Sequence, residues 1–343
     1  MTQLLLVLQP FGELLEPYLP EKMMPVFPFY TTVSRISYKP EVFDCKLVSD
    51  YIPSFMNMVN HKLTYGDVCD KRAIELLKIS GDIFVMWSGG IDSTCVLVSI
   101  LKNWPAQELK RITVLCNTDS IKENKKFLPI ITKNFKIETS SDRIEEFLKR
   151  GHVITGELGD QLFGSDIVGE CVRRWGDSVI KMPWQEVAPR LFEEFSPDKG
   201  KPTYSNYVEI VKESPIELKT VHDFFWWLNF SQKWQHVKLR TLGSKTWTNP
   251  KLYFPKLVHF YETIDFQVWS LHNQDKKIKD KWVTYKYTSK DYIVDYSKDT
   301  DYTYKLKLPS LFNLYVGTDF NWSVDEDWNF LSKEDTIKRI IND

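Results

Sequence analysis

The sequence has no Cys-x-x-Cys pair, no apolar run long enough to span a bilayer and no excess of charge of either sign. The first absence argues against a zinc ribbon or a dithiol redox pair, and five unpaired cysteines are typical of reduced thiols in a cytosol. The second argues against a membrane span, which needs about 20 apolar residues. The third, 45 basic against 46 acidic residues, disfavours a nucleic-acid partner without excluding one.

The amino-terminal stretch also lacks the marks of a targeting signal. Its first ten residues, MTQLLLVLQP, contain no basic segment and no small-residue cleavage site, so we expect a cytoplasmic protein that does not bind membranes. Prolines interrupt every apolar run over residues 1–62, which predicts an irregular arm or small subdomain. We expect one larger domain over residues 63–343.

What is present beyond residue 62 is an alternation of apolar strands and amphipathic helices. Strands are predicted at 82–87, 111–116 and 152–156, and helices at 66–80, 91–104, 124–135 and 142–150. This alternation predicts an α/β fold with a doubly wound parallel sheet. The carboxyl-terminal part is more helical and aromatic, with helices predicted at 222–240 and 258–271. The basic stretch DKKIKDKW, residues 275–282, is interpreted as a solvated face.

The most informative segment is SGGIDS, residues 88–93, between the first strand and the helix after it. Glycine lets the backbone approach a ligand closely, and the helix that follows adds the positive end of its dipole. The loop therefore predicts a phosphate site, to which Ser88 and Ser93 add hydroxyl donors. Asp92 is explained if Mg²⁺ lies between its carboxylate and the phosphates. The segment is neither a Walker A loop nor a dinucleotide G-x-G-x-x-G motif.

SGGIDS resembles the pyrophosphate-binding PP-loop of the adenine-nucleotide alpha hydrolase superfamily, whose members cleave ATP between the α and β phosphates. A second segment, TGELGDQLFGSD (residues 155–166), resembles the SGEGADELFGGY segment of asparagine synthetases and β-lactam synthetases. The matching residues are Gly156, Glu157, Asp160, Leu162, Phe163 and Gly164. The departures are Leu158 for glycine, Gly159 for alanine, Gln161 for glutamate and Ser165 for glycine.

The resemblance implies a ligand set for ATP and Mg²⁺. It makes Asp92 and Asp160 the metal ligands and catalytic carboxylates. It implies a nucleotide site built from Ser88, Gly89, Gly90, Ile91, Asp92, Ser93, Gly156 and Glu157, with the adenine near Leu115 and Asn117. Cys116, beside them, is interpreted as a core residue and not as a nucleophile.

The resemblance continues less sharply towards the carboxyl end. Residues 229–240 and 259–271 look like a degenerate version of the family's basic helix and PFLD segment. KDKWVTYKYTSKDYI, residues 279–293, looks like its KyiLRea helix. A late lysine of the family contacts pyrophosphate or the reacting carbonyl, and Lys305 or Lys307 is the expected catalytic counterpart.

The function that the resemblance implies is an ATP-dependent, AMP-forming ligase that adenylates a carboxylate and passes it to an amine. Asparagine synthetases begin with a glutaminase domain whose nucleophile is a terminal cysteine, but here Thr2 stands in that place and residues 1–62 are too few for that domain. The amine is then a small-molecule substrate, an amine within the activated acid itself as in β-lactam closure, or ammonia, free or supplied by a partner subunit. Two alternatives remain open: an adenylyltransferase acting on tRNA or a nucleobase, and a retired synthetase domain that only binds.

Overall fold

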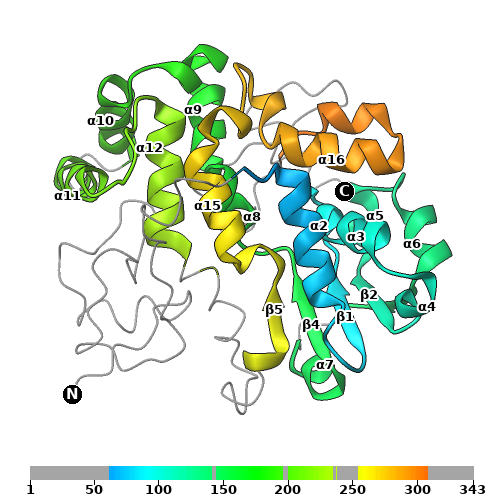
Figure 1. The fold of residues 1–343 in the computed structure, drawn as a ribbon. Coiled ribbons are helices and arrows are strands. Elements are labelled where there is room, and N and C mark those ends of the chain that lie inside the picture. Colours follow the sequence, from blue (N-terminus) through cyan, green and yellow to red (C-terminus); the bar gives the residue numbers. More distant parts are fainter. Residues whose placement is uncertain (1–61, 141–143, 196–199, 235–236, 238–253, 308–343) are drawn as a thin grey trace, which may run out of the picture.

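A computed structural model describes residues 62–140, 144–195, 200–234, 237 and 254–307 (Figure 1). The arm expected at residues 1–62 lies outside this part of the chain, apart from Lys62. The same holds for Cys45, for residues 308–343 and for the first residues of the helix predicted at 142–150.

The chain is an α/β protein built on a five-stranded parallel sheet (Figure 1). The strands are β1 (Ile83–Met86), β2 (Ile112–Cys116), β3 (Lys136–Thr139), β4 (His152–Thr155) and β5 (Leu257–His259). Their order is β3-β2-β1-β4-β5, so β1 is central and pairs with β2 on one side and β4 on the other. The three predicted strands are confirmed as β1, β2 and β4.

Strands β1, β2 and β4 are buried on both faces. Successive side chains of a strand point to opposite faces, so these strands contribute to two apolar clusters. Val85 and Val114 belong to a large apolar cluster that includes Val96 of helix α3 (Ile91–Asn103). Phe84 belongs to a smaller cluster with Phe147 of helix α7 (Ile144–Arg150). These near-continuous apolar strands are typical of a parallel sheet covered on both sides.

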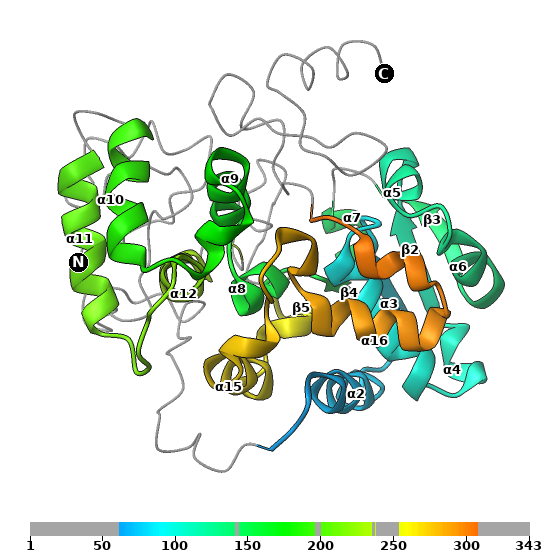
Figure 2. The ribbon, with the colours of Figure 1, turned by 90° about the horizontal axis from the view of Figure 1, so that it is seen from above.

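Some of the remaining helices flank the sheet, and the others form a helical side of the molecule. They are α2 (Tyr65–Leu76), α4 (Ala106–Leu109), α5 (Thr118–Glu123), α6 (Leu128–Asn134), α8 (Gly159–Phe163), α9 (Asp166–Trp175), α10 (Trp184–Phe195), α11 (Gly200–Lys212), α12 (Val221–Leu228), α15 (Ile264–His272) and α16 (Tyr287–Ser297). Figures 1 and 2 both place α10, α11 and α12 together on one side of the molecule and α3 to α6 on the other. Stacked aromatic rings hold the helical side together, with Trp184 on Phe224 at a centroid distance of 4.9 Å.

Two predictions for the carboxyl-terminal half are wrong in part. The helix predicted at 258–271 begins only at Ile264, because Val258 pairs with Ile154 in the sheet and a 3₁₀ turn follows at Phe260–Glu262. The stretch interpreted as a solvated face contains Lys277, which is fully buried. Its Nζ lies 3.3 Å from the centre of the Trp226 ring, so the tertiary fold turns this lysine inward.

The helix predicted at 222–240 is observed as α12 followed by a π-helical turn, Asn229–Lys233, and its last residues lie outside the described part. No helix in the described ranges has the length and apolar character needed to cross a bilayer. The four cysteines in those ranges, Cys69, Cys95, Cys116 and Cys171, are buried free thiols.

Candidate functional site

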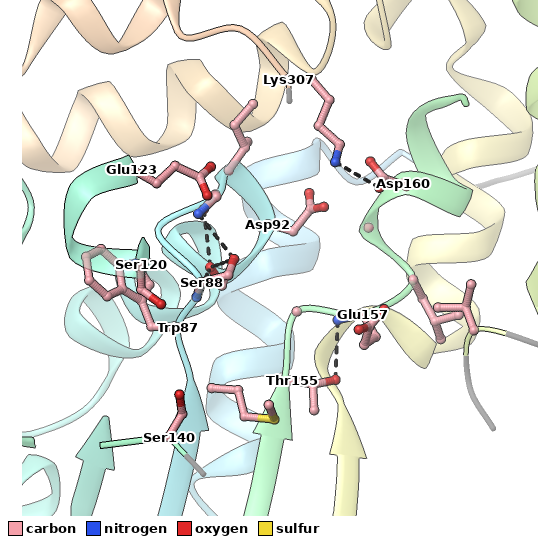
Figure 3. Close-up of a pocket in the computed structure, with 18 of the residues that line it drawn as sticks. Trp87, Ser88, Asp92, Ser120, Glu123, Ser140, Thr155, Glu157, Asp160 and Lys307 are labelled. Atoms are coloured by element: carbon pink, nitrogen blue, oxygen red, sulfur yellow. Dashed lines mark hydrogen bonds and ion pairs between the residues drawn. The ribbon is translucent and has the colours of Figure 1, made fainter. Parts of the chain in front are cut away.

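A cavity of 410 Å³ opens at the carboxyl ends of β1 and β4, where the strand order changes direction (Figure 3). Ligands of open parallel sheets bind at such a point, and the volume lies within the range of small-molecule sites, about 300–1,000 Å³. Its walls include Ser88, Gly90, Ile91, Asp92, Ser93, Leu115, Asn117, Gly156, Glu157, Asp160 and Lys307. Both motifs of the sequence therefore face one cavity.

The first motif forms a tight loop between β1 and α3. The Ser88 N–H donates to Ser93 Oγ at 3.1 Å, and the Gly90 N–H donates to Ser88 Oγ at 3.2 Å. Gly89 has a φ of +79°, and a Cβ there would lie 2.3 Å from the Ser120 carbonyl oxygen. The loop thus requires glycine at this position, because it has a left-handed backbone and packs directly on α5.

Helix α3 begins within this loop. Its N-cap is Gly90, which has no side chain to cap the first turn. The first N–H groups of a helix have no intrahelical partner and carry the positive end of its dipole. Because Ser88, Gly90 and Ser93 also line the cavity, this end of α3 is suited to hold phosphate oxygens.

The second motif packs directly on the first. A Cβ at Gly156 would lie 2.8 Å from the Ser93 nitrogen, and a Cβ at Gly159 would lie 2.4 Å from Asp92 Cγ. Leu158, where the similar family has glycine, has a φ of +75° although its side chain is buried. Close backbone contact between the loops therefore brings the two aspartates together.

Gln161 of α8 stands where the similar family has glutamate, and its uncharged amide bonds to the helical side. Its Nε2 donates to Asn229 Oδ1 at 2.9 Å, and the Asn229 amide donates to the Gly164 carbonyl. An amide pair makes these bonds without adding a further carboxylate beside Asp160.

Asp92 and Asp160 share one lysine, Lys286, which the sequence analysis missed. Lys286 Nζ lies 2.7 and 2.5 Å from the two carboxylate oxygens of Asp92 and 2.5 Å from Asp160 Oδ1. The lysine is fully buried, at the left-handed start of α16 with a φ of +60°. Its only signal in the sequence was its place in the segment that resembles the KyiLRea helix, residues 279–293.

The two late lysines have different surroundings. Lys307 lines the cavity, with its Nζ 3.3 Å from Asp160 Oδ2 and 3.8 Å from Asp166 Oδ1. Figure 3 shows Asp92, Asp160 and Lys307 converging from three separate segments. Lys305 instead donates to the Glu123 carbonyl oxygen at 2.9 Å. The geometry therefore places Lys307, of the two, at the aspartate end of the cavity.

The charges of this cluster separate the pKa values of the two carboxyl groups. Burial raises the pKa of Asp92 to about 6, and the neighbouring Asp160 adds to this while Lys286 and Lys307 oppose it. Asp160 is also buried, but the ammonium groups of Lys286 and Lys307 outweigh the burial and hold its pKa below the ordinary value. Asp160 and Asp166 in turn raise the pKa of Lys307 against the effect of its burial.

The opposite end of the cavity follows the second strand. Leu115 and Asn117 line it together with Ser120 and Glu123 of α5. Asn117 caps α5 by accepting a bond of 2.9 Å from the Ser120 N–H. Cys116 is a buried residue of β2, as interpreted from the sequence.

The residues at the aspartate end fit a magnesium ion. Asp92 and Asp160 each place a carboxylate oxygen 2.5 Å from the ammonium group of Lys286, so both can approach one cation. A Cβ on Gly159 would fill the space against Asp92. Within the described ranges no group of three or more acidic, histidine or cysteine side chains is arranged to hold a metal. Mg²⁺ needs no such group, since it takes one or two carboxylates and leaves its other positions to phosphates and water.

Comparison of the chain with protein-family models, with curated proteins and with solved structures finds no match.

Proposed function

We propose that the chain is an ATP-dependent, AMP-forming ligase that adenylates a carboxylate and passes it to an amine. The observation that carries the proposal is the cavity that the Ser88–Ser93 loop, Asp92 and Asp160 share at the carboxyl edge of the sheet. The resemblance of both loops to asparagine and β-lactam synthetases supports it. The strand order also supports the finer assignment to the doubly wound adenine-nucleotide alpha hydrolase fold.

The first step is an in-line attack of a substrate carboxylate oxygen on the α-phosphorus of ATP, with pyrophosphate leaving. The start of α3 and the hydroxyl groups of Ser88 and Ser93 would hold the leaving pyrophosphate, and Lys307 would add a positive charge at the same end. Asp92 and Asp160 would hold Mg²⁺, which neutralises phosphate charge when bound. The adenine would lie against Leu115 and Asn117 at the other end.

The second step is attack of the amine on the acyl carbon, with AMP leaving. The cavity of 410 Å³ must hold the nucleotide together with a small acid. Catalysis in this scheme rests on positioning the two reactants. A small-molecule amine, free ammonia and ammonia from a partner subunit all fit this chemistry.

The test is pyrophosphate release from MgATP by the full chain, with a panel of amino acids and other carboxylates, each with and without ammonium. The proposal predicts acid-dependent release of AMP and pyrophosphate, reduced at least about a hundredfold in Asp160→Asn. The matched control is Asp82→Asn, which changes an exposed carboxylate before β1 and leaves release unchanged. ATP binding without acid-dependent release would favour a nucleic-acid substrate, and no ATP binding would favour a retired domain.

A further inference from the structure

The carboxylate oxygens that would ligate a metal already engage lysine ammonium groups. Both oxygens of Asp92 lie within 2.7 Å of Lys286 Nζ. Asp160 Oδ1 lies 2.5 Å from the same nitrogen, and its Oδ2 lies 3.3 Å from Lys307 Nζ. A metal ion must therefore share every oxygen of the pair with a cation of the protein.

Lys286 is fully buried, and backbone hydrogen bonds hold it in place. Its side chain is fully buried, and it is not among the residues that line the cavity. Its backbone N–H donates to the Lys277 carbonyl oxygen at 2.8 Å, and its own carbonyl oxygen accepts from the Lys290 N–H at 3.0 Å. The backbone of Lys286 is thus held on both sides, and its buried ammonium group lies against the two carboxylates.

Further charged groups surround the two aspartates. Asp166 lies 3.8 Å from Lys307, and the charge of Lys233 acts on Asp160 from the π-helical turn. Three lysines therefore act on Asp92, Asp160 and Asp166, while Glu123 and Glu157 also line the cavity. A divalent cation that binds the pair is repelled by an ammonium group in contact with its own ligands.

We propose that Lys286 is a built-in counter-cation that keeps Asp92 and Asp160 from taking up a metal ion alone, so that metal and nucleotide bind together. The phosphates of the nucleotide supply further negative charge to the metal ion, and they engage Lys307 from the cavity side. The inference rests on the proposed roles of the two aspartates as metal ligands. Lys286 is a positioning residue in this scheme, since it acts through the carboxylates and not on the substrate.

The test is electron paramagnetic resonance of Mn²⁺ with the full chain, titrated with and without α,β-methylene-ATP. The wild type is expected to bind Mn²⁺ alone roughly tenfold or more weakly than in the presence of the analogue. Lys286→Met, which removes the charge and keeps the length, is expected to gain roughly tenfold or more in affinity for Mn²⁺ alone. Lys290→Met, which removes a buried lysine that donates to the Val283 carbonyl oxygen, is the control and behaves as the wild type.

Tight binding of Mn²⁺ alone by the wild type, no weaker than with the analogue, would overturn the inference even if Lys286→Met failed to fold. An Mn²⁺ affinity of Lys286→Met equal to that of the wild type would overturn it as well. Because the titration needs no turnover, its outcome is independent of whether any acid is adenylated. Acid-dependent pyrophosphate release with tight binding of Mn²⁺ alone would refute only the role of Lys286.

Discussion

Gly159 lies so close to Asp92 that a single added methyl group would meet its carboxylate, with a Cβ placed 2.4 Å from Asp92 Cγ. Gly159→Ala is therefore expected to displace Asp92 from Lys286 and from the cavity. We expect a loss of roughly 1–3 kcal/mol in the free energy of unfolding, the usual range for overpacking, and weaker binding of MgATP. Denaturant unfolding and nucleotide titration measure the two effects.

Gly66→Ala is the matched control for that substitution. A Cβ at Gly66 would meet the Tyr292 ring at 3.4 Å, which is an ordinary contact, and the residue lies in α2, away from the cavity. Alanine in a helix is more favourable than glycine by up to about 1 kcal/mol. If Gly159→Ala binds MgATP as well as Gly66→Ala does, the contact with Asp92 is unimportant for the site.

Leu158 allows a test of the strain in the second loop. Its φ of +75° is unfavourable for any side chain with a Cβ, by roughly 1–2 kcal/mol. Leu158→Ala and Leu158→Gly lose the same buried contacts apart from one carbon, but only glycine relieves the backbone. We expect the glycine variant to be the more stable of the two by about 1 kcal/mol in denaturant unfolding. The reverse order would mean that the loop relaxes without strain.

The two late lysines are expected to differ in function. Lys307→Met removes the ammonium group beside Asp160 and should lower the rate of pyrophosphate release by about a hundredfold, as for the loss of one charge-stabilising donor. Lys305→Met removes a lysine that contacts Glu123 and should lower the rate by less than about tenfold. Steady-state kinetics with saturating MgATP separates the two effects. Equal effects would contradict the assignment of Lys307 to the aspartate end of the cavity.

The lowered pKa of Lys290 leads us to expect that stability depends on pH. Burial, with help from Lys286 and Lys305, lowers its pKa to about 7. The unfolded chain then binds more protons than the folded chain between about pH 7 and the ordinary lysine value of 10.5, so this group makes stability rise with pH in that window. Lys290→Met is expected to be more stable than the wild type by roughly 1–3 kcal/mol at pH 7, with the difference shrinking towards pH 10.

The measurement is denaturant unfolding of both proteins from pH 6 to pH 10. All other titrating groups are shared, so the difference between the two curves reports the titration of Lys290 and its coupling to Lys286 and Lys305. The lost bond to the Val283 carbonyl oxygen shifts that difference by a constant, so the trend with pH carries the test. A difference that stays constant over the range would show that Lys290 keeps an ordinary pKa in the folded protein.

The sequence predicted those parts of the fold whose pattern is local and apolar. Strands β1, β2 and β4 are short apolar runs, and glycine-rich loops follow β1 and β4, so period and composition identify them. Strand β3 was missed because Lys136–Thr139 is a mostly exposed, polar edge strand. Strand β5, only three residues long, was merged into a helix because a short apolar run does not distinguish the two without its neighbours.

The residues of the candidate site likewise fall into those that a local motif predicts and those that only the tertiary fold places. Asp92 and Asp160 stand in glycine-rich motifs, and their shared position at the sheet edge follows from the parallel topology. Lys286 comes from a segment more than a hundred residues further on, and only the tertiary fold brings it between them. The choice between Lys305 and Lys307 likewise depends on the direction of each side chain after the 3₁₀ turn Thr300–Tyr304, which no local pattern records.

The most direct measurement of the central claim follows oxygen from the acid to AMP. An acid that supports pyrophosphate release is labelled with ¹⁸O in its carboxyl group and turned over with MgATP and the amine. Adenylation of the carboxylate predicts that one ¹⁸O appears in the phosphoryl group of each AMP, with no turnover in Asp92→Asn. Unlabelled AMP, or release of ADP and phosphate in its place, would contradict the account.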